Sequence, residues 1–107
     1  MSKAVMNQTA IKRKPLTGDL ATKARILALA GDETRIRILC TLFEYKNVCV
    51  SDIAESLKMS VASVSHHLQM LSENELVVTK REGKNICYSL NKHPLIKYIR
   101  QFICHKE

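Results

Sequence analysis

The sequence contains no long apolar run, no secretory leader and no recognisable catalytic motif. None of its apolar stretches approaches the roughly 20 residues that a membrane span needs. The first 15 residues, MSKAVMNQTAIKRKP, lack the apolar stretch of a secretory signal. Residue spacing offers no glycine-rich phosphate loop, no paired carboxylates and no nucleophile with its base. We therefore expect a cytoplasmic protein that makes no membrane contact and is not an enzyme.

Closely spaced cysteine pairs of the C-x-x-C type are also absent. The four cysteines are spread along the chain: Cys40, Cys49, Cys87 and Cys104. In a reducing cytosol such residues are expected to be thiols and not a disulfide framework.

Acidic residues are in deficit, and this gives the chain a strong positive charge. Seventeen Lys and Arg face 10 Asp and Glu, so the net charge is +7. Such an excess suggests a polyanionic partner where the fold presents the charges together. With 107 residues the chain has room for one domain and a modest core. A chain with a small core commonly gains stability by pairing with a second copy.

The pattern along the chain predicts a short arm followed by one domain. Residues 1–17 are basic and lack helical periodicity, which indicates a flexible N-terminal arm. The domain over 18–107 begins with two helices, the second capped by Asp32. Apolar stripes mark these helices at Leu20, Ala24, Leu27 and Ala28, and at Ile36, Leu39, Cys40 and Phe43.

The middle of the domain has the spacing of a helix-turn-helix. After a strand rung at 48–50, Ser51 is expected to cap a short helix with Ile53 and Leu57 inward. About three residues separate this helix from the next, which Ser60 is expected to cap. The inward residues of the second helix are expected to be Val61, Val64, Leu68 and Leu71.

A hairpin and a last helix complete the domain. Residues 76–81 and 86–90 read as two strands joined by a Glu82-Gly83 turn, which makes the hairpin the wing of a winged helix. The last helix starts at His93-Pro94 and carries Leu95, Ile99, Phe102 and Ile103 on one side. The predicted fold is therefore mostly α with a small β-hairpin, a winged helix-turn-helix of order ααβααββα.

The helix after Ser60 presents small and hydrogen-bonding residues on its outer face, as a recognition helix must to enter the major groove of DNA. Basic residues flank the wing turn and suit a neighbouring phosphate backbone. The predicted DNA contacts are Ser60, Ala62, Ser63, Ser65, His66, Gln69, Lys80, Arg81 and Lys84. We expect His67 to pack on the flank of its helix, because adjacent helical positions diverge by about 100°.

Four segments resemble the ArsR/SmtB family of bacterial sensors. Residues 28–39 (ALAGDETRIRIL) look like that family's ALADPTRLRIL, and residues 49–54 (CVSDIA) are similar to its CVCDLA. Residues 60–68 (SVASVSHHL) resemble its recognition helix SQPAVSHHL, and residues 81–84 (REGK) match its wing REGR. The resemblance covers residues 18–106. It implies a homodimer joined through the first and last helices, which represses a promoter at an inverted repeat in double-stranded DNA until an inducer acts.

The metal sites known in the family are incomplete in this sequence. The site at the third helix needs two cysteines, of which Cys49 is present while Ser51 occupies the second position. The zinc site on the last helix has Lys92 and Pro94 at its first two positions, and only His105 matches. No metal or other cofactor is therefore assigned with certainty.

Two cysteine pairs are candidate effector or redox sites. Cys40 and Cys104 resemble the cysteines of the family's persulfide- and redox-sensing branch. The alternative for Cys40 is a structural role as a small buried hydrophobic residue in the stripe of its helix. Strand alternation makes Cys49 and Cys87 possible cross-strand neighbours at the root of the wing. An oxidant or a soft metal is the hypothetical effector there, and thiol labelling unchanged by oxidant or copper would argue against it.

The same sequence features are also compatible with other classes of function. The main rival is a winged-helix protein without an effector, acting as a constitutive DNA binder or as a protein-interaction module. An RNA or architectural binder is a third class and predicts affinity without sequence preference. The basic residues around the recognition helix distinguish a DNA-binding protein from a pure protein-interaction module, because protein contacts alone do not require them.

Overall fold

The computed structural model describes Lys12 and residues 17–103. The rest of the predicted arm lies outside the described residues, as do Cys104 and His105, so these predictions stay untested. The elements are α1 (Gly18–Ala30), α2 (Glu33–Tyr45), β1 (Asn47–Cys49), α3 (Val50–Leu57), α4 (Val61–Glu73), β2 (Val77–Glu82), β3 (Asn85–Leu90) and α5 (Ile96–Ile103). Their order confirms the predicted ααβααββα winged helix.

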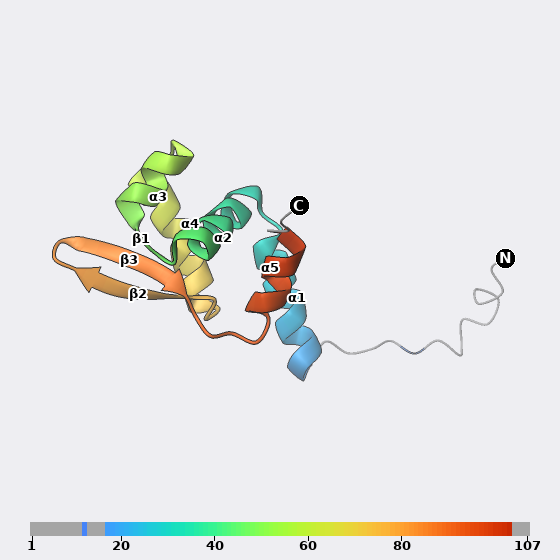
Figure 1. Ribbon diagram of the computed structural model, residues 1–107. Coiled ribbons are helices and arrows are strands. Elements are labelled where there is room, and N and C mark those ends of the chain that lie inside the picture. Colours follow the sequence, from blue (N-terminus) through green and yellow to red (C-terminus); the bar gives the residue numbers. More distant parts are fainter. Residues whose placement is uncertain (1–11, 13–16, 104–107) are drawn as a thin grey trace.

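The three strands form one antiparallel sheet with β3 between β1 and β2. The hairpin of β2 and β3 projects away from the helices as a wing (Figure 1). Glu82 pairs with Asn85, so the turn consists of Gly83 and Lys84, one residue later than predicted. Gly83 has a φ of +67°, a conformation that glycine adopts at little cost in a tight hairpin turn.

The hydrophobic core joins α2 and α4 to the remaining helices and to one face of the sheet. Its buried residues are Ile26, Leu29, Ile38, Leu39, Leu42, Ile53, Ala54, Val64, Leu68, Leu71, Leu76, Val77, Tyr88 and Ile99. Burial raises the pKa of the Tyr88 phenol, because the charged form loses hydration. Within the described part of the chain, no helix is long and apolar enough to cross a membrane.

The apolar stripes predicted for the first two helices differ from the buried residues. On α1 all four residues of the predicted stripe are exposed, whereas Ile26 and Leu29 enter the core. On α2 the fully buried residues are Ile38, Leu39 and Leu42, while the other members of the predicted stripe are half-buried. On α1 an apolar side is therefore left uncovered by the core of one chain, whereas on α2 the half-buried Phe43 packs against that core.

The start of α3 was also predicted wrongly. The helix begins at Val50 with Cys49 as its N-cap, and Ser51 is an exposed residue of its first turn. The reason is that β1 ends at Cys49 and leads directly into the helix, which leaves no separate capping residue. Asp52 lies in the first turn, where a carboxylate interacts favourably with the helix dipole.

An open apolar groove lies between α1 and α5, at the end of the domain away from the wing (Figure 1). Its volume is about 630 Å³. Leu27 beside it is 69% exposed and Phe102 is 86% exposed. The residues that line this α1–α5 groove are Lys23, Ile26, Leu27, Ala30, Gly31, Ile36, Leu95, Tyr98, Ile99, Phe102 and Ile103.

Candidate nucleic-acid interface

The helix-turn-helix consists of α3, a three-residue turn and α4. Lys58 ends α3 in the left-handed conformation, and the N–H of Met59 donates to the carbonyl oxygen of Ala54 at 2.9 Å. Ser60 then caps α4, since its hydroxyl accepts from the N–H of Ser63 at 3.1 Å. This confirms the predicted cap and fixes the direction in which α4 leaves the turn.

The two sides of α4 have different roles in the fold. Val64, Leu68 and Leu71 are fully buried against the core, as predicted. The outer side carries the predicted DNA contacts, with Ser60, Ala62, His66 and Gln69 exposed and Ser63 and Ser65 half-buried. The polar atoms on this side are therefore open to a ligand. The side chains that carry them are small enough for the helix to approach DNA closely.

A polar cluster attaches α4 to the N-terminus of α2. Arg35 donates from Nε to the carbonyl oxygen of Leu29 at 2.7 Å and from Nη1 to Nδ1 of His67 at 3.1 Å. Asp32 caps α2, since its Oδ2 accepts from the N–H of Arg35 at 3.0 Å. The half-buried His67 thus packs on the flank of its helix as expected, whereas His66 is exposed.

The Asp32 cap should make stability depend on pH. The hydrogen bond from the N–H of Arg35 lowers the pKa of Asp32, and the nearby Arg35 charge acts in the same direction. A carboxylate with a lowered folded-state pKa stabilises the fold above its unfolded pKa, and this stabilisation is lost as the pH falls through the folded pKa. We expect Asp32→Ala to lower the free energy of unfolding by about 1 kcal/mol at neutral pH, as measured by urea denaturation.

Asp32→Asn is the matched control for this prediction. Asparagine caps a helix about as well as aspartate, but it does not titrate. The Asn variant should therefore keep most of the neutral-pH stability and lose less stability on acidification than the wild type. Equal acid sensitivity in both proteins would show that the Asp32 carboxylate does not contribute the pH dependence.

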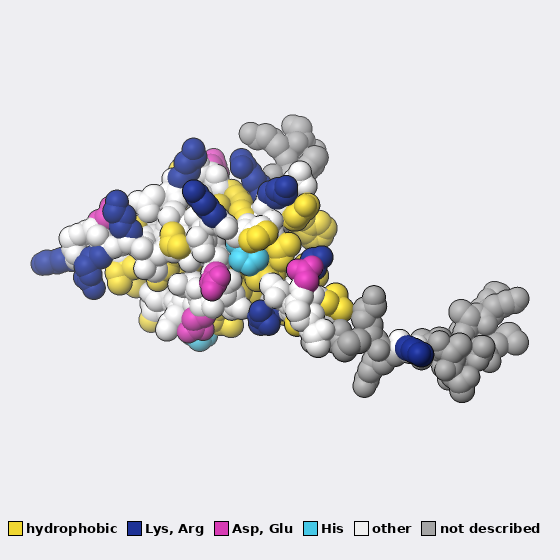
Figure 2. Space-filling view, turned by 90° about the horizontal axis from the view of Figure 1, so that it is seen from below, with side chains coloured by type: hydrophobic (Ala, Val, Ile, Leu, Met, Phe, Trp, Pro, Cys, Tyr) yellow, Lys and Arg dark blue, Asp and Glu magenta, His cyan; other side chains and the backbone are white. Residues whose placement is uncertain are grey.

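The wing carries the second group of predicted contacts. Lys80, Arg81 and Lys84 are all exposed. In the space-filling view, dark blue side chains gather at the projecting end of the molecule (Figure 2). A helix with an exposed polar side, combined with a projecting wing that has a basic tip, suits simultaneous contact with a groove and with neighbouring phosphates.

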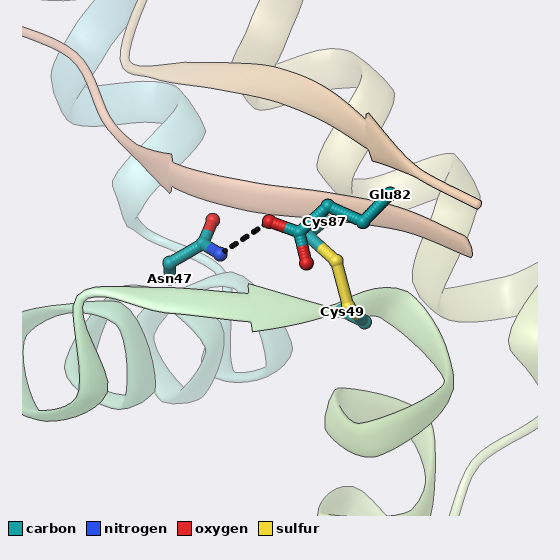
Figure 3. Close-up of a disulfide and its surroundings, with 4 residues drawn as sticks. All are labelled: Asn47, Cys49, Glu82 and Cys87. Carbon is teal, nitrogen blue, oxygen red and sulfur yellow. Dashed lines mark hydrogen bonds between the residues drawn. A yellow bond between two sulfur atoms is a disulfide. The ribbon is translucent and has the colours of Figure 1, made fainter.

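At the root of the wing, a disulfide links Cys49 of β1 to Cys87 of β3 (Figure 3). The two residues are directly opposite one another in the strand register. This confirms the predicted cross-strand neighbours and corrects the expectation that all four cysteines are thiols. Glu82 lies beside the pair, and its carboxylate accepts from Nδ2 of Asn47 at 3.2 Å.

Comparison with known proteins identifies the family. The pattern described as "Bacterial regulatory protein, arsR family" matches residues 32–79. The arsenical resistance operon repressor of Staphylococcus xylosus is 37% identical over 76 residues, 71% of each chain. The SmtB homolog of Synechocystis sp., a transcriptional repressor, is 32% identical over 82 residues, 77% of this chain and 61% of that protein. The chain belongs to the ArsR family.

Solved structures agree with this membership. The AntR antimony-specific transcriptional repressor aligns with a TM-score of 0.69 and 26% identity, over 90% of this chain and 87% of that chain. Reduced HlyU from Vibrio cholerae aligns with a TM-score of 0.68 and 26% identity, over 79% of this chain and 92% of that chain. As an ArsR-family member, the chain is a DNA-binding transcriptional repressor, which confirms the function predicted from its sequence.

The structure of this ArsR-family protein also brings together residues that sequence reasoning did not connect. Among the described residues, one group of three metal-ligand types converges, namely Cys49, Cys87 and Glu82, with ligand atoms within 4.8 Å of one another. Glu82 had been placed in the turn, so its position on the face of Cys87 was missed. The observed register, with Gly83-Lys84 as the turn, is what brings it there, and no sequence signal favoured this turn over Glu82-Gly83.

Val61 is a second missed residue. It was predicted to face inward, but its side chain is 47% exposed at the start of α4. Apolar residues at this end of a recognition helix can contact the methyl group of thymine. The first turn of a helix is often less covered than its middle, so apolar spacing alone did not distinguish an inward from an outward Val61.

Proposed function

We propose that this ArsR-family repressor binds an inverted-repeat operator as a homodimer and is released by an inducer that acts on its cysteines. The observation that carries the proposal is that α4 leaves its small-residue side exposed and that the projecting wing has an exposed basic tip. Promoter binding would also place the protein with the chromosome, in the cytoplasm.

The major-groove contacts are assigned to the outer side of α4. Hydroxyl, imidazole and amide groups there can hydrogen-bond base edges, while the helix N-terminus favours a phosphate. This group consists of Ser60, Ala62, Ser63, Ser65, His66 and Gln69. Lys80, Arg81 and Lys84 would bind phosphates beside the groove.

The second copy is assigned to the α1–α5 groove. Leu20, Leu27, Tyr98 and Phe102 are large apolar side chains that one chain leaves exposed on these two helices. Such side chains gathered on one open face mark an interaction surface, and a two-fold dimer uses the same patch on both copies. This arrangement would place two recognition helices one turn of DNA apart.

The cysteines are the proposed site of induction. Sγ of Cys40, which is half-buried, lies 3.9 Å from the carbonyl oxygen of Ile103, the residue that precedes Cys104. A reaction of Cys40 with Cys104 would connect α2 of the core to the dimer-forming α5. Cys49 and Cys87 are the second pair, and they connect the wing to α3.

The test is a binding titration of the reduced protein with the DNA upstream of its own gene. A scrambled duplex of equal length is the control, and two salt concentrations separate phosphate contacts from base contacts. The titration is repeated with polysulfide, zinc and arsenite. Selective binding that one of these abolishes is the expected result, whereas selective binding that none affects would favour a constitutive winged-helix protein.

Neutralising the wing tip should weaken binding without changing the preferred sequence. In the Lys80→Gln/Arg81→Gln/Lys84→Gln variant, each lost phosphate contact is expected to reduce the slope of log K against log salt by about 0.9. Affinities for operator and scrambled DNA should fall by similar factors, since phosphates carry no sequence information. An unchanged slope would contradict the placement of the wing on DNA.

Three exposed lysines away from the wing and α4 offer a matched control. Lys46, Lys92 and Lys97 are exposed at the end of α2, in the loop before α5 and on α5, and none of them lines the α1–α5 groove. Their replacement by Gln removes the same formal charge. We expect the salt slope of this control to stay close to that of the wild type, because long-range attraction alone is screened beyond about 10 Å at 0.1 M salt.

A further inference from the structure

We infer that the reduced root of the wing is a binding site for a soft divalent cation such as zinc, formed by Cys49, Cys87 and Glu82. The disulfide is then the closed state of this site, and reduction opens it. The site itself is independent of DNA binding. Only its regulatory consequence rests on the proposed repressor function.

The convergence of three strands carries the inference. Cys49 of β1 is opposite Cys87 of β3, and Glu82 of β2 is a diagonal neighbour of Cys87 on the same face of the sheet. The two Sγ atoms and a carboxylate oxygen lie within 4.8 Å of one another. All three side chains point toward the same space between the strands (Figure 3).

The Glu82 carboxylate is held at this place by a neighbour. Asn47 donates a hydrogen bond to one carboxylate oxygen, Oε2, at 3.2 Å. Asn47 lies on the same strand and the same face as Cys49. A ligand oriented in this way before the cation arrives loses less freedom on binding, and such supporting partners strengthen metal sites.

The donor set selects the class of cation. Two thiolates and a carboxylate suit zinc or cadmium, which accept sulfur and oxygen together, better than magnesium or calcium, which prefer oxygen alone. Three protein ligands leave a fourth tetrahedral position for water. Cys87 is fully buried while Cys49 is half-buried and Glu82 is exposed, so a cation would enter from the Glu82 side.

Opening of the site is a two-electron reduction. A dithiol reductant of the thioredoxin class donates two electrons and two protons, the Cys49–Cys87 bond breaks, and the reductant becomes a disulfide. The cation then replaces both thiol protons, which are released to solvent. Oxidation of the empty site reverses the first step, so disulfide and bound cation exclude one another.

The position of the site explains how a change from disulfide to bound cation would affect the DNA-binding surface. Cys49 is the N-cap of α3, the first helix of the helix-turn-helix, and Cys87 pairs in register with Lys80 of the wing. A disulfide holds its sulfurs about 2.05 Å apart, whereas two thiolates on one tetrahedral zinc lie about 3.7 Å apart. The exchange would therefore shift the wing relative to α3 and move Lys80.

The experiment uses the full chain carrying Cys40→Ser and Cys104→Ser, so that Cys49 and Cys87 are the remaining cysteines. Cobalt(II) is titrated as a coloured substitute for zinc into reduced and into oxidised protein without DNA. Reduced protein should bind one ion per chain with a thiolate charge-transfer band and tetrahedral visible bands, and zinc should displace it. Oxidised protein should show neither band. Binding by the oxidised form, or none by the reduced form, would overturn the inference.

Glu82→Gln tests the third ligand. Loss of a supporting partner commonly weakens a metal site about 10–100-fold, so loss of a direct ligand should weaken it at least tenfold. Glu44→Gln, an exposed glutamate on α2, is the matched control and should bind like the wild type. Cys49→Ser and Cys87→Ser should each remove the charge-transfer band. Equal affinity of the two Gln variants would exclude Glu82 from the site.

The regulatory consequence is measured separately, by operator binding of the reduced protein with and without zinc. We expect zinc to weaken operator binding about 5- to 150-fold, and the operator to weaken zinc binding by the same factor. A bound cation with unchanged operator affinity would overturn this coupling and leave the site intact. Failure to bind any operator would instead overturn the proposed function, since the cobalt titration contains no DNA.

Discussion

Leu27→Glu is expected to convert the protein from a dimer into a monomer and to abolish operator binding at concentrations where the wild type is saturated. Leu27 is 69% exposed in one chain and lines the α1–α5 groove, so a dimer would bury it twice. Burial of a leucine contributes about 1.5–3 kcal/mol, and an unpaired carboxylate opposes burial further. The dimer dissociation constant should therefore rise at least 100-fold, as measured by analytical ultracentrifugation.

Tyr45→Glu provides the control for this substitution. Tyr45 is a large apolar side chain at the end of α2, 65% exposed and outside the groove lining. The same charge introduced there should leave the dimer intact. Circular dichroism checks that both variants fold, which is expected because neither side chain belongs to the core. A Leu27→Glu protein that dimerises like the wild type would exclude the groove as the interface.

The helix-turn-helix could be predicted from the sequence because its signals are local. A serine at the start of α4 satisfies an unpaired N–H, and this requirement depends on a few residues only. The same holds for Asp32 at the start of α2. The outer side of α4 followed from the buried side by helical geometry, and the candidate DNA contacts on it are exposed or half-buried.

Which apolar stripe enters the core could not be read from spacing alone. On α1, Leu27 and Ala28 are spaced like core residues, but Ile26 and Leu29 are the ones buried. Periodicity indicates that a helix side avoids water, and it does not distinguish burial in the same chain from burial against a second copy. On α1 the prediction therefore failed on one of the two helices that are proposed to form the dimer.

The wing root was predictable only in part for a related reason. Alternation along short strands was enough to place Cys49 opposite Cys87. The contribution of Glu82 depends on the hairpin register, which a shift of one residue in the turn changes for every side chain. No local signal separated a Glu82-Gly83 turn from a Gly83-Lys84 turn.

Two substitutions on α4 should separate its structural side from its DNA-binding side. Leu68 is 0% exposed in the core, while His66, two positions earlier and so on the opposite side of the helix, is exposed. Leu68→Ala is expected to lower the free energy of unfolding by about 2–5 kcal/mol, because it leaves a cavity among close-packed side chains. The measurement is urea denaturation at one fixed protein concentration, since dimer stability depends on concentration.

His66→Ala should have the opposite profile. An exposed helical position changes stability by no more than about 0.5 kcal/mol when it becomes alanine, so the urea midpoint should stay near that of the wild type. Operator affinity should fall about 5- to 150-fold, as expected when a base contact worth about 1–3 kcal/mol is lost, while affinity for scrambled DNA changes little. If His66→Ala instead lowered both affinities equally, its role would be a phosphate contact. If it lowered neither, the outer side of α4 would not be the surface that reads the operator.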